Sequence, residues 1–356
     1  MIIALRSWSF WVLALGLGWG PAVALATPSP AVLAIVSQVQ GTNSTPQTDS
    51  FQDFFATLPV NQGDQRGYSG TSPQPDLLAA RTTIYDRLSA LLTPVGGSVS
   101  YQSFTQSGYT GYNIVGVLPG YGASSTQQYI LGAHYDAVQN PGASDNGSGV
   151  AGVLEAAYVL SRYQFQSSLY FIAFDLEEKG LWGSNNYAAQ AKAANADIKG
   201  MISLDMIAYN YLQKNLAEIC ISSGEPSTAL QNEVAQAYAD YTSLTSHLRI
   251  GITGSDHSPF ATQGYPGVLV IEELKTNGAP TNPYYHQATD YYLDSDDQPN
   301  TYNGLPYIDF TYAEQMTRGA VGWIAAEAIV VPEPATILLF GPAAFWMWWR
   351  RRRSAP

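Results

Sequence analysis

The chain has 356 residues, a length that suits one large domain or two ordinary ones. Apolar residues make up 46% of it and charged residues only 12%, about half the roughly 25% that is usual in soluble domains. The formal net charge of −12 is opposite to what phosphate neutralisation requires, which excludes a nucleic-acid-binding protein. A single cysteine excludes intramolecular disulfides and cysteine-rich zinc folds, so any metal must be held by histidines and carboxylates.

Residues 1–26 carry the ordered features of a secretory signal peptide. Arg6 precedes an uncharged, largely apolar stretch over residues 10–17, and Ala24-Leu25-Ala26 offers the small residues of a cleavage site. A permanent membrane helix is the alternative, but the apolar stretch is short and Pro21 interrupts the segment that follows it. We therefore predict that this segment directs export and is removed.

Between the two terminal segments, strand-like and helix-like patterns alternate. Residues 27–75 carry two short helix-like stretches joined by loop, and apolar residues on one face predict a helix over 76–92 that Pro94 ends. Strands are predicted at 99–104, 112–118, 129–132, 168–174, 201–204, 216–222 and 267–271, and helices at 147–162, 184–194, 226–241 and 310–330. Several of the strands are continuous apolar runs, as in sheets that are covered on both faces. The alternation predicts one α/β domain over 76–331, with helices on both sides of a sheet.

Residues 332–356 form a second terminal segment of unusual composition. Pro332-Glu333-Pro334 is followed by a mostly apolar stretch over 335–349 and then by the arginines 350–353. A plain tail anchor is the alternative, although the stretch is short against the roughly 20 residues that span a bilayer. The combination resembles the PEP-CTERM sorting signal of Gram-negative bacteria, which implies processing at the membrane by an exosortase-type enzyme. We expect export to the periplasm, cell surface or extracellular matrix, with this segment in the membrane until it is processed.

Chemically reactive residues gather where predicted strands end, which is where α/β proteins build their sites. Each has an ordinary explanation by itself, such as a structural histidine, a helix-capping aspartate or a surface glutamate. Together they form a set of nitrogen and oxygen ligands that two zinc ions require, with one bridging carboxylate and a position open to water. The members of this set are His134, Asp145, Glu177, Glu178, Asp205 and His286.

Six strings in this region resemble, in the same order, motifs of the co-catalytic zinc exopeptidases of peptidase clan MH. That family includes secreted bacterial leucyl aminopeptidases, glutamate carboxypeptidases and glutaminyl cyclases. The strings are GAHYDAV (132–138), GASDNGSGV (142–150), DLEEKGLWGS (175–184), SLDMIAY (203–209), SDHSPF (255–260) and NPYYHQATDYY (282–292). The resemblance covers about residues 76–330 and implies a three-layer α/β/α sandwich with a central mixed, mostly parallel sheet.

The resemblance also implies two zinc ions per chain. Asp145 would bridge both ions, His134 and Asp205 would complete one site, and Glu178 and His286 would complete the other. A strained, cis peptide bond after Asp145 is implied as well.

Catalytic roles follow from the same resemblance. Glu177 would be the general base acting on a metal-bridging water and would later deliver the proton to the leaving amine, while the metals polarise the scissile carbonyl. Asp136 would accept a hydrogen bond from the free ring nitrogen of His134 and fix its tautomer. The leading hypothesis is therefore an exported dizinc aminopeptidase that removes N-terminal residues from peptides.

Three other functions remain as alternatives. The first is a glutaminyl cyclase, an acyltransferase with one zinc, because SDHSPF resembles the corresponding loop of those enzymes. Against it, cyclases typically have Trp before the last histidine, where this chain has Tyr285. A carboxypeptidase would require cations for the substrate carboxylate, and the motif segments offer few beyond Lys179 and Lys275. A non-catalytic surface-binding relative would be expected to have lost ligands, and none is lost.

Residues near the motifs are expected to shape the pocket. The resemblance implies that Asp256 and His257 border it, with structural packing as the alternative, and Asp290 is either a support for the metal ligands or an ordinary turn aspartate. Because Cys220 has no partner for a disulfide, the pocket wall must be built in another way. The loop over 275–283, rich in Asn, Gly and Pro, is predicted to influence specificity.

Overall fold

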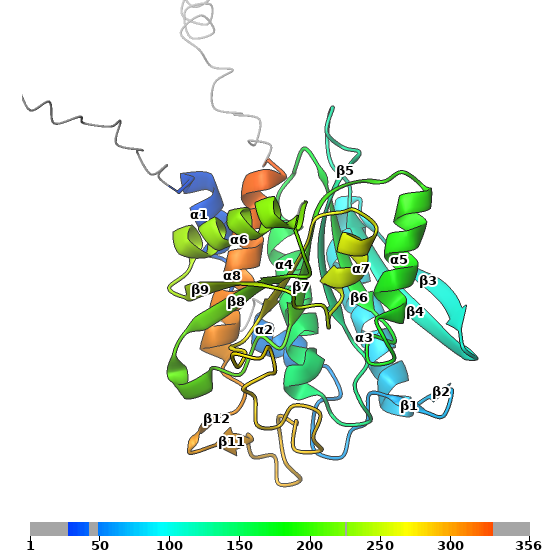
Figure 1. The fold of residues 1–356 in the computed structure, drawn as a ribbon, viewed down its shortest axis with the longest axis vertical. Coiled ribbons are helices and arrows are strands. Elements are labelled where there is room, and N and C mark those ends of the chain that lie inside the picture. The colour runs from blue at the N-terminus through cyan, green and yellow to red at the C-terminus, as the bar shows by residue number, and fades with distance from the viewer. Residues whose placement is uncertain (1–27, 43–48, 225, 330–356) are drawn as a thin grey trace, which may run out of the picture.

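The computed structural model describes residues 28–42, 49–224 and 226–329 (Figure 1). An eight-stranded mixed sheet with the order β3-β4-β6-β5-β7-β10-β8-β9 forms its centre. These strands are β3 (Ser98–Gln106), β4 (Tyr109–Leu118), β5 (Gln127–His134), β6 (Ser168–Phe174), β7 (Asp197–Asp205), β8 (Leu216–Ile221), β9 (Thr245–Ile250) and β10 (Gly267–Ile271). Two short hairpins join β1 (Tyr68–Ser69) to β2 (Ser72–Pro73) and β11 (Thr301–Tyr302) to β12 (Leu305–Pro306).

Parallel pairing dominates the middle of the sheet. Strands β6, β5, β7 and β10 are mutually parallel, and β8 and β9 are parallel to each other. Strand β4 is antiparallel to both of its neighbours, β3 and β6, and β8 is antiparallel to β10. The predicted mixed, mostly parallel sheet is confirmed.

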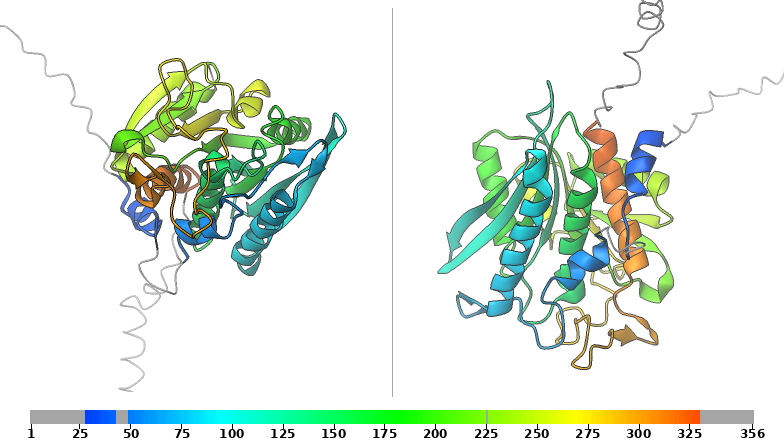
Figure 2. Two further views of the ribbon diagram at one scale, coloured as in Figure 1. Left: turned by 90° about the horizontal axis from the view of Figure 1, so that it is seen from below. Right: turned by 180° about the vertical axis from the view of Figure 1, so that it is seen from behind.

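Helices cover both faces of the sheet (Figures 1 and 2). Helices α3, α4, α6 and α8 share one apolar core with one face, whereas α5 and α7 pack on the other. Successive strand residues alternate between these cores, as Ile130 and Leu131 do, which explains the continuous apolar runs. The helices are α1 (Pro30–Val36), α2 (Phe51–Ala56), α3 (Pro75–Leu92), α4 (Gly149–Leu160), α5 (Trp182–Ala193), α6 (Ser227–Tyr241), α7 (His257–Thr262) and α8 (Phe310–Glu327).

Local sequence explains how the long helices begin and end. Pro75 occupies the first turn of α3, and Gly96 adopts a positive φ of 85° just after the short 3₁₀ turn that follows it. The carboxylate of Asp309 caps α8 by accepting hydrogen bonds from the amides of Thr311 and Tyr312, each at 3.0 Å. The three-layer α/β/α sandwich is therefore confirmed, with every strand and helix predicted after residue 76 present.

Within the sandwich, two elements were not expected from the sequence. Strand β9 lies at the edge of the sheet and is largely exposed, so it lacks an apolar run. Helix α7 has only six residues, which is too short for a helical period to be visible.

The N-terminal part of the described chain packs on the rest. Helices α1 and α2, expected as short helices, contact α4 and α8. No helix within 28–42, 49–224 and 226–329 is long and apolar enough to cross a membrane. The predicted signal peptide (1–26) and the predicted sorting signal (332–356) lie outside the described residues.

Candidate metal centre

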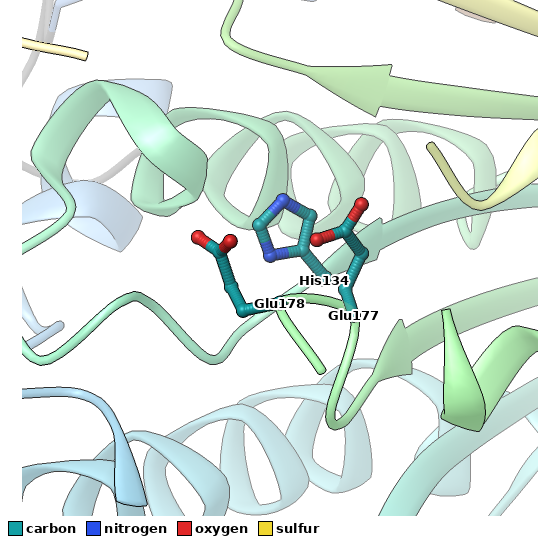
Figure 3. Close-up of side chains that lie close together, drawn as sticks. All are labelled: His134, Glu177 and Glu178. Carbon is teal, nitrogen blue, oxygen red and sulfur yellow. The ribbon is translucent and has the colours of Figure 1, made fainter. Parts of the chain in front are cut away.

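The carboxyl ends of the parallel strands bring the first predicted residues together. Because β5, β6 and β7 are adjacent and parallel, residues that end or follow them meet at one edge of the sheet. His134 ends β5 and Asp205 ends β7, whereas Glu177 and Glu178 follow β6. Figure 3 shows the two glutamate side chains on either side of the His134 ring.

Two loops complete the set. Asp145 lies in the turn that enters α4, where a cis peptide bond joins it to Asn146, as the resemblance implied. Gly142 opens this turn with a φ of +60°, and an added Cβ would lie 2.4 Å from the carbonyl oxygen of Asp145, so only glycine fits. His286 comes from the long loop between β10 and α8. All six residues line one pocket of about 260 Å³.

The carboxylate of Asp145 lies between two groups of ligand atoms. Its Oδ1 is 3.3 Å from His134 Nε2, which is itself 3.5 Å from Asp205 Oδ1. Its Oδ2 is 3.2 Å from His286 Nε2, which is 3.3 Å from Glu178 Oε2. We call the group of His134 and Asp205 the strand half and the group of Glu178 and His286 the loop half.

The donor atoms fit two zinc ions. Two ligands on one tetrahedral zinc, with bonds of about 2.0–2.1 Å, lie about 3.3 Å apart, close to the separations within each half. Nitrogen and carboxylate oxygen donors suit this ion. Glu178 Oε1 is buried without a hydrogen-bond partner in the described part of the chain, as expected of an atom in a site built to hold a cation.

The surrounding charges favour cations throughout the centre. Burial lowers the pKa of His134, but the carboxylates of Glu177 and Asp205 outweigh this effect and raise it well above the ordinary value. His286 is less buried, and hydrogen bonds to Asp145 and Glu178 raise its pKa to about 10 against the effect of burial. A zinc ion must therefore displace protons from both rings.

Glu177 lines the pocket rather than standing as a paired surface charge. Burial raises the pKa of its carboxyl well above the ordinary value; nearby His134 opposes that rise, and Asp256 adds to it. Its amide donates a hydrogen bond to Asp136 Oδ1 at 3.0 Å, and the amide of Glu178 lies 3.3 Å from Asp136 Oδ2. The Asp136 carboxylate therefore orients the turn that carries both glutamates.

The expected contact between Asp136 and His134 differs in detail. The shorter contact of His134 Nδ1 is with the main-chain carbonyl oxygen of Asp136, at 3.0 Å, whereas Asp136 Oδ1 is 3.7 Å away. The carbonyl accepts the ring hydrogen because the carboxylate is engaged by two amides. Asp136 therefore accepts a hydrogen bond from His134, as predicted, but through its main-chain carbonyl oxygen.

Asp256 and His257 do not border the pocket, contrary to expectation. Both are fully buried behind the wall, which residues 251–254 form instead. His257 Nε2 is 2.9 Å from the carbonyl oxygen of Ile252 and so supports that wall, and burial lowers its pKa to about 4. Burial raises the pKa of Asp256 to about 7.

Two supporting residues were missed by sequence reasoning. Ser255 Oγ donates a hydrogen bond to Asp205 Oδ2 at 2.7 Å and so orients a strand-half ligand. Arg66 is fully buried and donates to the carbonyl oxygens of Tyr135, at 3.0 Å, and Pro141, at 2.8 Å, and also to that of Gly142. A lone serine and an arginine in a loop-rich segment carry no pattern that marks them.

The pocket extends from the metal centre along an apolar wall. Side chains that line it include Met206, Ile252, Leu269, Ile271 and Leu274, all within one apolar cluster. From the loop over 275–283, residues Asn277, Gly278 and Pro280 also line the pocket. This placement agrees with the predicted influence of that loop on specificity.

Comparisons with known proteins relate this geometry to a family. The signature of peptidase family M28 matches residues 113–315, more than half of the chain. A probable leucine aminopeptidase of Trichophyton verrucosum is 28% identical over 232 residues, which is 61% of this chain and 59% of the relative. The chain spans about half to three-fifths of the length of the curated relatives it matches.

Solved structures share the fold. The LapA aminopeptidase of Legionella pneumophila superposes with a TM-score of 0.67 at 20% identity, covering 84% of this chain and 74% of that one. BSAP, a zinc aminopeptidase from Bacillus subtilis, gives a TM-score of 0.52 at 25% identity, covering 64% of this chain and 52% of that one. A glutaminyl cyclase of Bacteroides thetaiotaomicron gives a TM-score of 0.61 at 18% identity, covering 80% of this chain and 100% of that one. The fold alone therefore does not separate the two activities.

Proposed function

This chain belongs to peptidase family M28, and from that premise we propose that it is a dizinc aminopeptidase that hydrolyses N-terminal residues from peptides. The observation that carries the proposal is the Asp145 carboxylate, one oxygen of which faces the strand half and the other the loop half. His134 and Asp205 would hold one ion, Glu178 and His286 the other, and Asp145 both. The similarity to a zinc aminopeptidase supports the choice of metal.

The mechanism assigns proton transfer to one glutamate. Two bound zinc ions would polarise the scissile carbonyl and lower the pKa of water at the centre. Glu177 takes the proton from the attacking water and delivers it to the leaving amine, and the rise of its pKa on burial makes it a stronger base. Asp136 keeps Glu177 in place through its amide. Tyr285 lines the pocket stacked on His286, and burial raises the pKa of its hydroxyl, which therefore keeps its proton and can donate a hydrogen bond to the substrate.

The pocket offers no basic side chain for a C-terminal substrate end. Its described lining contains four carboxylates, whose charge two zinc ions would balance, and neither lysine nor arginine. A carboxypeptidase would need such a cation to hold the substrate carboxylate. The lining therefore argues against a carboxypeptidase.

The apolar wall indicates the preferred side chain. A substrate residue held at the metal centre extends towards Ile252 and Leu274, where it buries apolar surface. We propose a preference for large apolar N-terminal residues, which agrees with the naming of one relative as a probable leucine aminopeptidase. Replacing Leu274 by lysine is expected to reverse the selectivity between leucyl and glutamyl substrates.

The proposal is tested with the purified protein and a leucyl chromogenic amide. We expect hydrolysis that a chelator abolishes and added zinc restores, and no hydrolysis of the same amide with an acetylated N-terminus. Equal hydrolysis of the acetylated amide would contradict an aminopeptidase. Cyclisation of an N-terminal glutamine without amide hydrolysis would instead support the glutaminyl cyclase. If the purified protein shows neither activity and binds no zinc, the result would support a binding protein.

Export is a separate proposal that rests on the terminal segments of the sequence. We propose that residues 1–26 direct export and that an exosortase-type enzyme processes residues 332–356, leaving the protein in the periplasm, at the cell surface or in the extracellular matrix of a Gram-negative bacterium. Mass spectrometry of the protein from its native cells tests both cleavages. Intact ends on a protein found in the cytoplasm would contradict the proposal.

A further inference from the structure

Five buried polar side chains form a closed hydrogen-bonded ring beside the loop half. Each is at most 5% exposed, and together they join the turn before α4, the end of β10, the His286 loop and the segment before α8. We call this group the polar ring; its members are Ser144, Glu272, Asn282, Asp290 and Tyr307.

The connections run around the whole ring. The Tyr307 hydroxyl is 2.9 Å from Asp290 Oδ1 and 3.1 Å from Asn282 Oδ1. Asn282 Nδ2 donates to Glu272 Oε1 at 2.9 Å and to Ser144 Oγ at 3.1 Å. The amide of Ser144 donates back to Asp290 Oδ1 at 2.7 Å and closes the ring. Polar groups this deeply buried are costly unless they are satisfied, so the ring fixes the four segments relative to one another.

The ring holds the bridging ligand from one side. The amide of Asp145 donates to Asp290 Oδ2 at 3.1 Å, and the amide of Ala143 donates to the carbonyl oxygen of Asp290 at 3.1 Å. Three consecutive amides of the Asp145 turn therefore point at Asp290. Asp290 is therefore tied to the Asp145 turn by bonds that do not involve the Tyr307 hydroxyl.

His286 lacks the support that His134 has. Metal-binding histidines usually donate the second ring N–H to a carboxylate or carbonyl, as His134 does to the carbonyl of Asp136. Within the described residues, the polar contacts of the His286 ring are only with the ligands Asp145 and Glu178. Its position therefore depends on its main chain, which the polar ring pins on both sides, at Asn282 and at Asp290.

We propose that the polar ring is a positioning device that takes the place of the missing histidine partner and sets the affinity of the loop half for its metal. The inference rests on the proposed dizinc centre. The residues of the polar ring touch no substrate; they act through the loop that carries His286. The strand half, which has its own supports in Asp136 and Ser255, does not depend on the Tyr307 link.

The test is zinc affinity rather than activity. In Tyr307→Phe the ring loses only the hydroxyl that links Asp290 to Asn282. Competition with a chromophoric chelator measures the affinities of the two zinc equivalents of the full-length protein separately. We expect the weaker equivalent to bind ~10–100-fold less tightly than in the wild type, which is the cost typical of losing such a support. The affinity of the tighter equivalent should be unchanged. Added zinc should restore kcat with KM unaltered.

A matched control separates positioning from general stability. The hydroxyl of Tyr238 is also fully buried and donates to a carbonyl, that of Met316, but it lies between α6 and α8. Tyr238→Phe should lower the melting temperature and leave both zinc affinities unchanged. Where Tyr307→Phe does not fold, Asn282→Ala breaks the same link and is measured instead.

The outcomes distinguish this inference from the proposed function. If the wild-type protein binds two zinc ions and Tyr307→Phe binds both with wild-type affinity, the inference is overturned and the proposed function stands. Equal weakening of both equivalents also overturns it, because the effect is then not confined to the loop half. A wild-type protein that binds fewer than two zinc ions removes the proposed function itself.

Discussion

The strand half and the loop half of the metal centre present the same kinds of donor atom on different supports. His134 and Asp205 end two strands of the sheet, and their side chains are 2% and 8% exposed. Glu178 and His286 lie on connecting segments, and the His286 side chain is 36% exposed. Secondary structure places the first pair directly, whereas the second pair requires hydrogen bonds between segments distant in sequence. The comparison indicates that the two metals differ in how firmly the protein prepares their sites.

The largest expected effect belongs to a residue outside both halves. Glu177→Gln keeps the shape of the side chain and removes its ability to take a proton, so kcat should fall by ~10²–10⁴ while both zinc ions stay bound. Steady-state kinetics together with zinc analysis measure the two effects. Glu178→Gln, one residue away, is the matched comparison and should weaken the binding of zinc in the loop half. Full activity of Glu177→Gln would refute the mechanism.

Removing one histidine from each half should show the difference in burial. With a chelator present, His134→Ala leaves buried carboxylates without their cation and should lower the free energy of unfolding by about 3 kcal/mol. His286→Ala removes ion pairs that solvent partly screens and should lower it by less, about 1 kcal/mol. Urea unfolding near pH 6, where the raised pKa keeps His134 protonated, provides the measurement. Equal losses would remove the distinction between the halves.

A milder substitution tests the support of the strand half alone. Ser255→Ala removes the hydrogen bond to Asp205 and should weaken the strand-half zinc by ~10-fold or somewhat more. The loop-half zinc should keep its affinity, the opposite of the pattern expected for Tyr307→Phe. Chelator competition on both variants would reveal whether the two supports act independently; weakening of the same zinc in both would show that they do not.

For a change of less than one pH unit, the smallest effect is that of pH. The pKa of His286 is raised to about 10, so below that pH a proton competes with the loop-half zinc, and its affinity should fall by up to about tenfold for each pH unit lost. The pKa of His134 is also raised, so the strand half should respond in the same direction. Calorimetry in buffers of different ionisation enthalpy should detect protons released on zinc binding. Binding without proton release would contradict these protonation states.

The sequence predicted the strand half more directly than its surroundings. Strand patterns followed by His134, Glu177 and Asp205 place those residues at one sheet edge by topology alone. The loop-half assignment of His286 came from the family resemblance, because no local pattern places a loop residue.

Only part of the support of the site could be predicted, for a physical reason. Asp290 could be named as a candidate support, whereas Ser255 reaches Asp205 across 50 residues, a separation that follows no pattern. Arg66 falls in a segment predicted as loop, although its guanidinium donates to the main-chain carbonyls of Tyr135 and Pro141. The family resemblance implied that the loop of Asp256 and His257 borders the pocket, but both are buried at the start of a short helix, α7.

The most direct test of the dizinc centre is a crystal structure of the zinc-soaked protein with data collected on both sides of the zinc absorption edge. We predict two anomalous peaks, one bounded by His134, Asp145 and Asp205, the other by Asp145, Glu178 and His286. A single peak, or peaks away from Asp145 at full zinc occupancy, would contradict a bridged pair of metals and with it the proposed mechanism.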